Sequence, residues 1–402
     1  MASGSLFQKL VSLNPDLAAL VEKGYAVTFD TGWMVIRDVP YLDSQGALCW
    51  GALATKLVFV DASRVVQEDH TVLFAGAHPC GLDGAIIPLI DAGAHTLALS
   101  DACKDVAIER RFSNKPTKAG KFENFFEKVE SYVGIISGPA IHRHGVSPLN
   151  FKSVEDSPVP TVFKFQDSLT SKAEISELSS KFENDVIAVI GLGGTGAYLL
   201  DFLVKMPVRE IRGFDGDAFH VHNAFRSPGR LDEAELGKPK AEVYENRYAS
   251  FRNGVKLTSQ YIDSESGEAL DGVTFAFVCV DKGSSRSAIF DLLIAKGIPF
   301  IDVGMGLKRS DGPLKGMMRV TYYPAEKAQK IRDMGLAEMN DGPENLYRTN
   351  VQIAELNALN ASLAAIRFKQ VRGFYVENHP YYHLLLDLVD LKIVGEAHDD
   401  ED

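Results

Sequence analysis

The sequence predicts an α/β protein in which a mostly parallel sheet forms the second half and a smaller α+β domain precedes it. From about residue 171 onward, short apolar stretches alternate with segments of helical periodicity, as in a parallel sheet with crossover helices. The first part instead holds short β-rich pieces separated by polar turns, which favour an antiparallel sheet. A stretch rich in Pro, Ser and Asp separates the two patterns. We therefore expect two domains, at residues 1–165 and 166–402.

The composition is that of an ordinary globular chain. It has 402 residues, of which 46% are hydrophobic and 24% charged, and a formal net charge of -12. This acidic balance argues against nucleic acid or an anionic membrane as a partner. No apolar run approaches the roughly 20 residues of a membrane span, and the N-terminus lacks the features of a signal peptide. We expect a cytoplasmic protein. Its four cysteines include no CxxC pair, so neither a disulfide framework nor a cysteine-based zinc site is expected.

Periodicity places the elements of both domains. In the first domain we expect a helix at Leu6–Lys23, a second helix at 120–140, and strands at 25–29, 33–42, 56–62 and 70–76. In the second domain we expect strands at 185–191, 208–215, 255–262, 273–281 and 298–304. A hairpin at 306–323 and a long helix at 351–370 follow.

A glycine cluster joins the first strand of the second domain to its first helix. Gly191, Gly193, Gly194 and Gly196 form the pattern GxGGxG, which lets a backbone approach phosphate oxygens at a helix N-terminus. Asp215 ends the next strand, where a carboxylate can hold ribose hydroxyls. The pattern predicts a Rossmann-like sheet that binds an adenosine nucleotide, and at this point NAD and ATP fit equally well.

Cationic side chains beyond Asp215 favour ATP. Asn223, Arg226 and Arg230 follow in the next loop, and Lys238 and Lys240 begin the next helix. A triphosphate attacked at its α-phosphorus needs such donors, because the leaving pyrophosphate gathers negative charge. The alternative is a solvated basic loop.

Asp281 ends the strand at 273–281, on the edge of a parallel sheet where ligands bind. A carboxylate there suits Mg²⁺, which takes few protein ligands together with phosphate oxygens. The alternative is that Asp281 caps the following helix, and both roles can coexist.

Residues 185–305 resemble the ThiF/MoeB/HesA adenylyltransferases, the superfamily that includes ubiquitin-activating enzymes. Five elements match in order: Gly191–Gly196, Asp215–Asp217, Asn223–Arg226, Gly237–Lys240 and Cys279–Asp281. The resemblance implies ATP-dependent adenylation of the C-terminal carboxylate of a ubiquitin-like or sulfur-carrier protein. It also implies site roles: Asp215 and Asp217 toward the nucleotide, Asn223, Arg226 and Lys240 toward the phosphates, and Asp281 toward magnesium.

The chain departs from that family at several positions. An arginine that relatives carry before the first strand is missing, so Lys172, Lys181, Arg230 or an arginine from elsewhere in a dimer takes its place. Ser227 replaces the glutamine that follows Asn-x-x-Arg. The zinc tetrad of many relatives is absent, and no zinc is expected. Because relatives pair through this domain, and the helix at 351–368 carries much apolar surface, we expect a homodimer.

The first domain offers one candidate thiol, Cys80, which lies in a glycine-rich turn two residues after His78. A reactive cysteine needs exposure and a lowered pKa, so we favour a semi-buried turn residue over a catalytic one. Cys279 lies in an apolar strand, and we expect it in the core. The acyl group then passes to Cys80, to a hydroxyl such as that of Ser310 or Thr349, or directly to a separate conjugating protein.

Two other functions compete with adenylation. A nicotinamide-dependent oxidoreductase explains the glycines and Asp215, but it leaves the basic loop and Asp281 without a role. A non-catalytic scaffold that binds a ubiquitin-like protein would not need the nucleotide-binding residues, yet this sequence has a suitable residue at every one of those positions. An adenylating enzyme of a bacterial ubiquitin-like conjugation pathway is therefore the favoured hypothesis.

Overall fold

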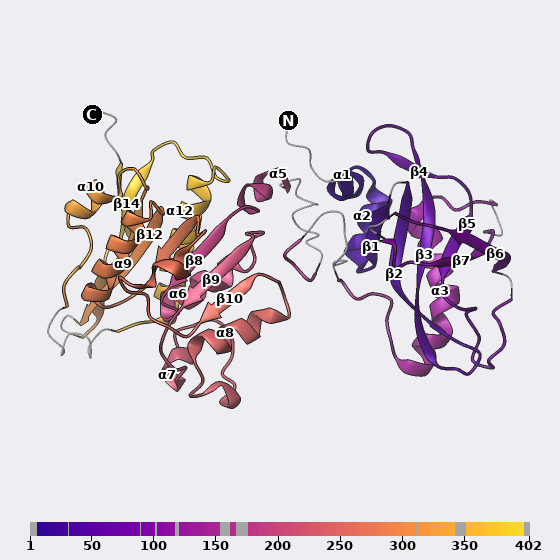
Figure 1. Cartoon of the computed structure of the whole chain (residues 1–402), viewed down its shortest axis with the longest axis horizontal. Coiled ribbons are helices and arrows are strands. Elements are labelled where there is room, and N and C mark those ends of the chain that lie inside the picture. The colour runs from indigo at the N-terminus through magenta and orange to yellow at the C-terminus, as the bar shows by residue number, and fades with distance from the viewer. Residues whose placement is uncertain are drawn as a thin grey trace. The chain divides into compact units, whose positions relative to one another are not determined.

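The structure, a computed structural model, describes residues 6–30, 32–88, 90–100, 103–116, 120–152, 161–165, 176–309, 312–341 and 351–397. The chain divides into two compact units, Met1–Glu177 and Leu178–Asp402, and each is built around its own sheet (Figure 1). Within the described ranges, no helix combines the length and the apolarity that crossing a membrane requires.

The first unit contains an antiparallel sheet, as the sequence predicts. Its path runs β1-β2-β3-β5-β7-β6, and β4 pairs with β3. The strands are β1 (Ala26–Asp30), β2 (Trp33–Leu42), β3 (Leu48–Phe59), β4 (Val65–Gln67), β5 (Thr71–Ala75), β6 (Asp91–Leu97) and β7 (Ile108–Ser113). The sequence pattern located β1, β2, β5 and part of β3. It missed β4, β6 and β7, in which apolar and polar residues do not alternate cleanly.

Helices α1 (Leu6–Leu13), α2 (Pro15–Lys23) and α3 (Phe125–His144) share one apolar core with this sheet. The expectation of one continuous helix at Leu6–Lys23 is wrong. Asn14 takes an extended backbone conformation and Pro15 starts the second helix, because proline fits the first helical position but interrupts a helix interior. Asn14 also donates to the carbonyl oxygens of Leu10 and Ser63, which holds the break in place.

The second unit contains an eight-stranded sheet in the order β10-β9-β8-β11-β12-β13-β14-β15. The first five strands of this order are parallel and the remaining pairs are antiparallel. The strands are β8 (Val186–Ile190), β9 (Glu210–Phe214), β10 (Val255–Thr258), β11 (Phe275–Val278), β12 (Phe300–Arg309), β13 (Leu314–Tyr323), β14 (Tyr381–Asp387) and β15 (Lys392–Ala397). The predicted α/β, mostly parallel sheet is confirmed, although β14 and β15 were not foreseen.

Helices cover both faces of this sheet (Figure 1). The helices from residue 176 onward are α5 (Ser176–Ser179), α6 (Gly194–Leu203), α7 (Val221–Ala224), α8 (Lys240–Ala249), α9 (Gly283–Ala295), α10 (Ala328–Asp333) and α12 (Ala354–Val371). One core joins α6, α8 and α12 to the sheet, and the other joins α9 and α10 to it. From β8 the chain proceeds through β9 to β10 on one side, and then returns to β11 and β12 on the other. In such a sheet, ligands bind beyond the carboxyl ends of the strands where the order reverses, here β8 and β11.

Candidate functional site

A cleft of about 2130 Å³ opens in the second unit at the carboxyl ends of β8 and β11. The predicted site residues that line it are Gly191, Gly193, Gly194, Asp215, Asp217, Arg226, Lys240 and Asp281. Gly196 and Asn223 are not among the lining residues. Pockets for one small molecule commonly measure about 300–1,000 Å³, so this cleft has room for a nucleotide and part of a second substrate.

The glycines of the turn are needed for different structural reasons. Gly191 has a φ of +92°, and a Cβ there would lie 2.7 Å from the carbonyl oxygen of Cys279. A Cβ on Gly196 would lie 1.9 Å from the Gly191 carbonyl oxygen, so Gly196 lets α6 pack closely on the turn. A Cβ on Gly193 would meet no atom within 4 Å. Since Gly193 caps α6 and lines the cleft, its open side faces the place where a helix N-terminus attracts an anion.

An ion cluster lies beside the glycine turn, in which Lys240 and Asp215 are buried and Asp217 is exposed. Lys240 Nζ lies 3.2 Å from Oδ1 of Asp215 and 2.7 Å from Oδ2 of Asp217. The Asp215 carboxylate also accepts the backbone N–H groups of Leu192 (2.8 Å) and Asp217 (2.9 Å). A carboxylate has about four acceptor positions, so Asp215 is largely committed to holding the turn and the loop together.

Asp217 is the more open of the two carboxylates, since its side chain is 55% exposed whereas that of Asp215 is 7% exposed. Tyr261 donates its hydroxyl to Asp217 Oδ1 at 2.5 Å. Burial raises the pKa of Asp217, but the hydrogen bonds from Lys240 and Tyr261 outweigh this effect and bring the pKa below 3.8. Asp217 is therefore ionised near neutral pH and can accept hydrogen bonds from hydroxyl groups.

Arg226 brings a positive charge to the cleft, and its Nε atom is buried without a hydrogen-bond partner within the described part of the chain. An unsatisfied guanidinium beside a glycine turn fits a polyphosphate. Asn223 has a different place: it is 3% exposed, and its Oδ1 accepts the backbone N–H of His220. Its carbonyl oxygen accepts the Ser227 hydroxyl at 2.7 Å. Asn223 thus organises the loop that carries Arg226, and its direct contact with phosphate stays a prediction.

Asp281 is exposed and lines the cleft. It does not cap α9: the N-cap residue is Lys282, and Asp341 accepts the backbone N–H of Ser284 at 3.0 Å and its hydroxyl at 2.6 Å. Across the ranges that the structure describes, no group of three or more His, Cys, Asp or Glu side chains could hold a metal ion. A single exposed carboxylate beside a phosphate site nevertheless fits Mg²⁺, which completes its shell with phosphate oxygens and water.

The cysteines differ in their surroundings. Cys279 follows β11 and packs against the core as expected, but it is only partly buried and also lines the cleft. Burial and the nearby Asp302 raise the pKa of its thiol. In the first unit, Cys80 is 1% exposed, and burial together with Asp43 and Asp83 raises the pKa of its thiol. These surroundings are the opposite of those that activate a thiol.

Two further candidates, Lys181 and Arg230, are described and do not line the cleft. Lys181 Nζ donates to the carbonyl oxygen of Gly373, and Arg230 is exposed without lining the cleft. Lys172, Ser310 and Thr349 lie outside the described residues.

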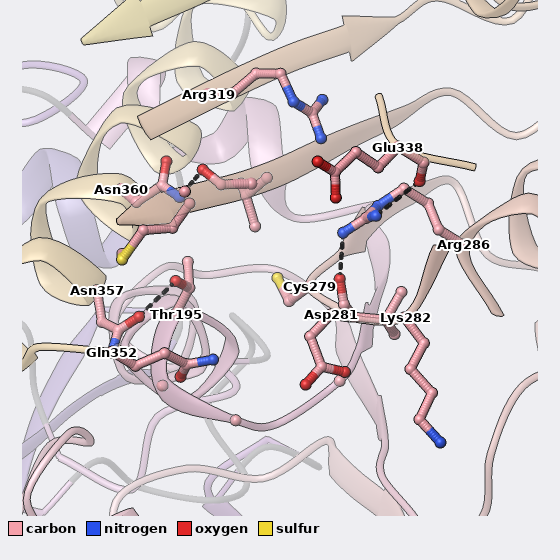
Figure 2. Close-up of a pocket in the computed structure, with 18 of the residues that line it drawn as sticks. Thr195, Cys279, Asp281, Lys282, Arg286, Arg319, Glu338, Gln352, Asn357 and Asn360 are labelled. Carbon is pink, nitrogen blue, oxygen red and sulfur yellow. Dashed lines mark hydrogen bonds between the residues drawn. The ribbon is translucent and has the colours of Figure 1, made fainter. Parts of the chain in front are cut away.

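Two asparagines of α12 were missed by the sequence analysis. Asn357 is 1% exposed: its Oδ1 accepts the Thr195 hydroxyl at 3.0 Å, and its Nδ2 donates to the Arg226 carbonyl oxygen at 3.4 Å. Asn360 donates to the carbonyl oxygen of Gly304 at 3.1 Å. Figure 2 shows both asparagines across the cleft from Asp281. Their three-residue spacing places both amides on one face of the helix, beside the buried Ala361 and Ala364, and is the signal that could have identified them.

A buried charge network was also missed. Asp302 is fully buried and accepts hydrogen bonds from Arg286 (Nε, 3.1 Å) and Arg319 (Nη2, 2.5 Å). Arg319 also donates to the hydroxyl of Thr321, which contacts His383 at 2.8 Å. Burial lowers the pKa of His383, and Arg319 lowers it further. Arg286, Arg319 and His383 line the cleft, so the network holds these three side chains in place along its wall.

The fold and the glycine turn define a Rossmann-like α/β domain. Residues 169–365 match the ThiF family, and residues 15–168 match a domain of unknown function, DUF6791. The chain therefore carries a ThiF-family domain, which confirms the family that the five motifs predicted.

Solved structures similar to this chain include PaaA, in its selenomethionine form, at 16% identity and a TM-score of 0.42, covering 55% of this chain and 75% of that one. E. coli MccB with ATP is 18% identical, with a TM-score of 0.43, and the match covers 55% of this chain and 65% of MccB. The microcin C7 biosynthetic enzyme MccB with N-formylated MccA is 18% identical, with a TM-score of 0.43, covering 57% and 70%. The chain spans 64% to 66% of MccB in three of the MccB structures that it matches. No curated protein sequence matches the chain.

Proposed function

We propose that the ThiF-family domain adenylates the C-terminal carboxylate of a ubiquitin-like or sulfur-carrier protein. A carboxylate oxygen attacks the α-phosphorus of ATP, the bond from that phosphorus to the bridging oxygen breaks, and pyrophosphate leaves with the electron pair. The products are an acyl-adenylate and pyrophosphate. The observation that carries the proposal is one cleft that holds a glycine turn, the unsatisfied guanidinium of Arg226 and the exposed carboxylate of Asp281.

Each group has a role in this reaction. The glycine turn and the first N–H groups of α6 bind phosphate oxygens. Asp217, supported by Asp215, accepts the ribose hydroxyls, while Arg226 and Lys240 offset the charge that develops on the leaving pyrophosphate. Asp281 holds Mg²⁺, which supplies further charge neutralisation at the phosphates.

The same groups argue against the competing functions. Hydride transfer to or from a nicotinamide has no use for Arg226 and Asp281 in the cleft. A scaffold that only binds a ubiquitin-like protein has no use for a nucleotide-sized cleft lined by eight of the predicted site residues. Adenylation gives all of them a function.

We further propose that the protein works in the cytoplasm as a homodimer and passes its product directly to a separate conjugating protein. The exposed side chains of Leu359 and Ile366 on α12 offer apolar surface for pairing, and a partner subunit is one source of the missing arginine. A monomer by light scattering at micromolar concentration would contradict the pairing. Direct transfer fits the burial of Cys80, and it predicts that Cys80→Ser leaves both adenylation and transfer intact.

Pyrophosphate exchange tests the reaction itself. With a cognate carrier protein and Mg²⁺, the chain should exchange radiolabelled pyrophosphate into ATP. Exchange must also depend on the carrier's free C-terminal carboxylate, so a C-terminally amidated carrier serves as the control. A protein that binds carrier and ATP without exchange would be a scaffold.

A further inference from the structure

The antiparallel extension of the sheet presents an unusual face to the cleft. Side chains two residues apart lie on one face of a strand, so Gly304, Gly306 and Lys308 of β12 share a face. Their cross-strand partners on β13 are Arg319, Met317 and Lys315, in that order. All six residues line the cleft.

The inner end of this face adjoins the reaction centre. Asn357 contacts Thr195 beside the glycine turn, and Asn360, about one helical turn later, donates to the carbonyl oxygen of Gly304 (Figure 2). Gly304 therefore lies next to the place where ATP and a carboxylate would meet. A Cβ on Gly306 would meet no atom within 4 Å, so this face of β12 and β13 stays open toward its outer end.

The outer end is basic. Lys308 and Lys315 are directly opposite each other across the two strands, and both are exposed. Like charges in this position destabilise a sheet. Neither lysine forms an ion pair with a carboxylate of the described residues, and the one acid on the same face of β14 is Asp387, which accepts the backbone N–H of Val389. In a chain with a net charge of -12, this local excess of positive charge favours the binding of an anionic ligand.

We propose that Lys308 and Lys315 select an acyl partner that carries acidic side chains shortly before its C-terminal carboxylate. The inference rests on the proposed adenylation and specifies its partner. Lys308 lies four residues beyond Gly304, which is about 13 Å along a strand. An extended tail whose last residues lie over Gly304 therefore places its acidic side chains about four or more positions before its end.

Labelled peptides test the selection. One peptide has a free C-terminus, small residues at its last four positions and glutamates at the preceding four, and the matched peptide has glutamines there. Fluorescence anisotropy at low ionic strength, with a non-hydrolysable ATP analogue and Mg²⁺ present, should show about tenfold tighter binding of the glutamate peptide. The difference should shrink in high salt, since exposed ion pairs are screened.

Variants assign the effect to the two lysines. The double variant K308E/K315E should lose the preference, whereas K330E, at an exposed lysine of α10 outside the cleft, should keep it. ATP titration of each variant verifies that the nucleotide site is intact. Equal binding of the two peptides to the wild-type protein, binding of neither while ATP binds, or an unchanged preference in K308E/K315E would overturn the inference. If the wild-type protein does not bind ATP at all, the proposed adenylation itself is overturned.

Discussion

The Thr195 hydroxyl at the start of α6 donates a hydrogen bond of 3.0 Å to Oδ1 of Asn357 in α12, 162 residues further along the chain. The same side chain donates from Nδ2 to the carbonyl oxygen of Arg226. One buried amide thus connects the glycine turn, the helix that covers it and the loop that carries a cation into the cleft. The shape of the proposed nucleotide site therefore depends on a residue that need not touch the nucleotide.

Asn357→Ala should lower the free energy of unfolding of the second unit by about 1–3 kcal/mol, because it leaves buried polar partners unsatisfied. It should also weaken ATP binding. Far-UV circular dichroism during urea unfolding measures the change. Trp33 and Trp50, the two tryptophans of the chain, lie in the first unit and provide a fluorescence reference for it. Ser362→Ala, which removes only a hydroxyl bonded to its own helix at Ala358, should change stability by less than about 0.5 kcal/mol. Equal effects of the two variants would contradict this role for Asn357.

Two glycine substitutions should separate folding from binding. Gly196→Ala places a Cβ 1.9 Å from a backbone oxygen and should destabilise the second unit by about 1–3 kcal/mol or more, with loss of ATP binding. Gly193 has a φ of -73° and open space beside it, so Gly193→Ala should fold normally. Its methyl group would still enter the phosphate site and weaken ATP binding. Thermal unfolding and calorimetric titration measure the two effects, and unchanged ATP affinity in Gly193→Ala would place the phosphates elsewhere.

Lys240→Met should destabilise the second unit by about 3–5 kcal/mol, because it leaves the buried carboxylate of Asp215 uncompensated. Lys238→Met is the matched control: Lys238 is exposed, 3.9 Å from Glu242, and its loss should change stability by less than about 1 kcal/mol. Urea unfolding of both variants provides the comparison. A Lys240 variant as stable as the Lys238 variant would show that the ion cluster contributes little.

The same cluster predicts a pH dependence. The folded-state pKa of Asp217 lies below the unfolded value of 3.8, so its contribution to stability is present above that value. It is lost as the pH falls through the folded-state pKa. Wild-type stability should therefore drop on acidification below about pH 4, and Lys240→Met should show a shallower drop over the same range. Parallel curves for the two proteins would contradict the assignment.

Asp281→Ala should reduce carrier-dependent pyrophosphate exchange by about 100- to 1000-fold, which is typical for loss of a strong electrostatic group at a reacting phosphate. Asp271→Ala, at an exposed carboxylate that pairs with Lys296 on the surface, should leave exchange unchanged. Exchange assayed over a range of Mg²⁺ concentrations shows whether excess metal restores activity. Near-wild-type exchange by Asp281→Ala would exclude Asp281 as the magnesium ligand.

The sequence was most informative where one local pattern determines the structure. Gly191 and Gly196 predict a tight strand-to-helix turn, because a side chain at either position would clash with the backbone. The apolar runs at β8 and β11 predict buried strands, and the residues of both runs are buried. Contacts between distant segments were not predictable in this way. The bonds of Asn357 and Asn360 exist only because α12 packs on α6 and β12, and the position of Cys279 depends on where β11 ends. The interrupted helix at Asn14 had a local signal in Pro15, which the apolar periodicity of Leu6–Lys23 outweighed.

Calorimetric titration of the purified chain with ATP and with NAD⁺, each in the presence of Mg²⁺, tests the central claim most directly. The account predicts ATP binding that is weakened by Gly193→Ala and by Asp281→Ala, and no measurable binding of NAD⁺. Tight binding of NAD⁺ without binding of ATP would contradict it and would identify the cleft as a dinucleotide site.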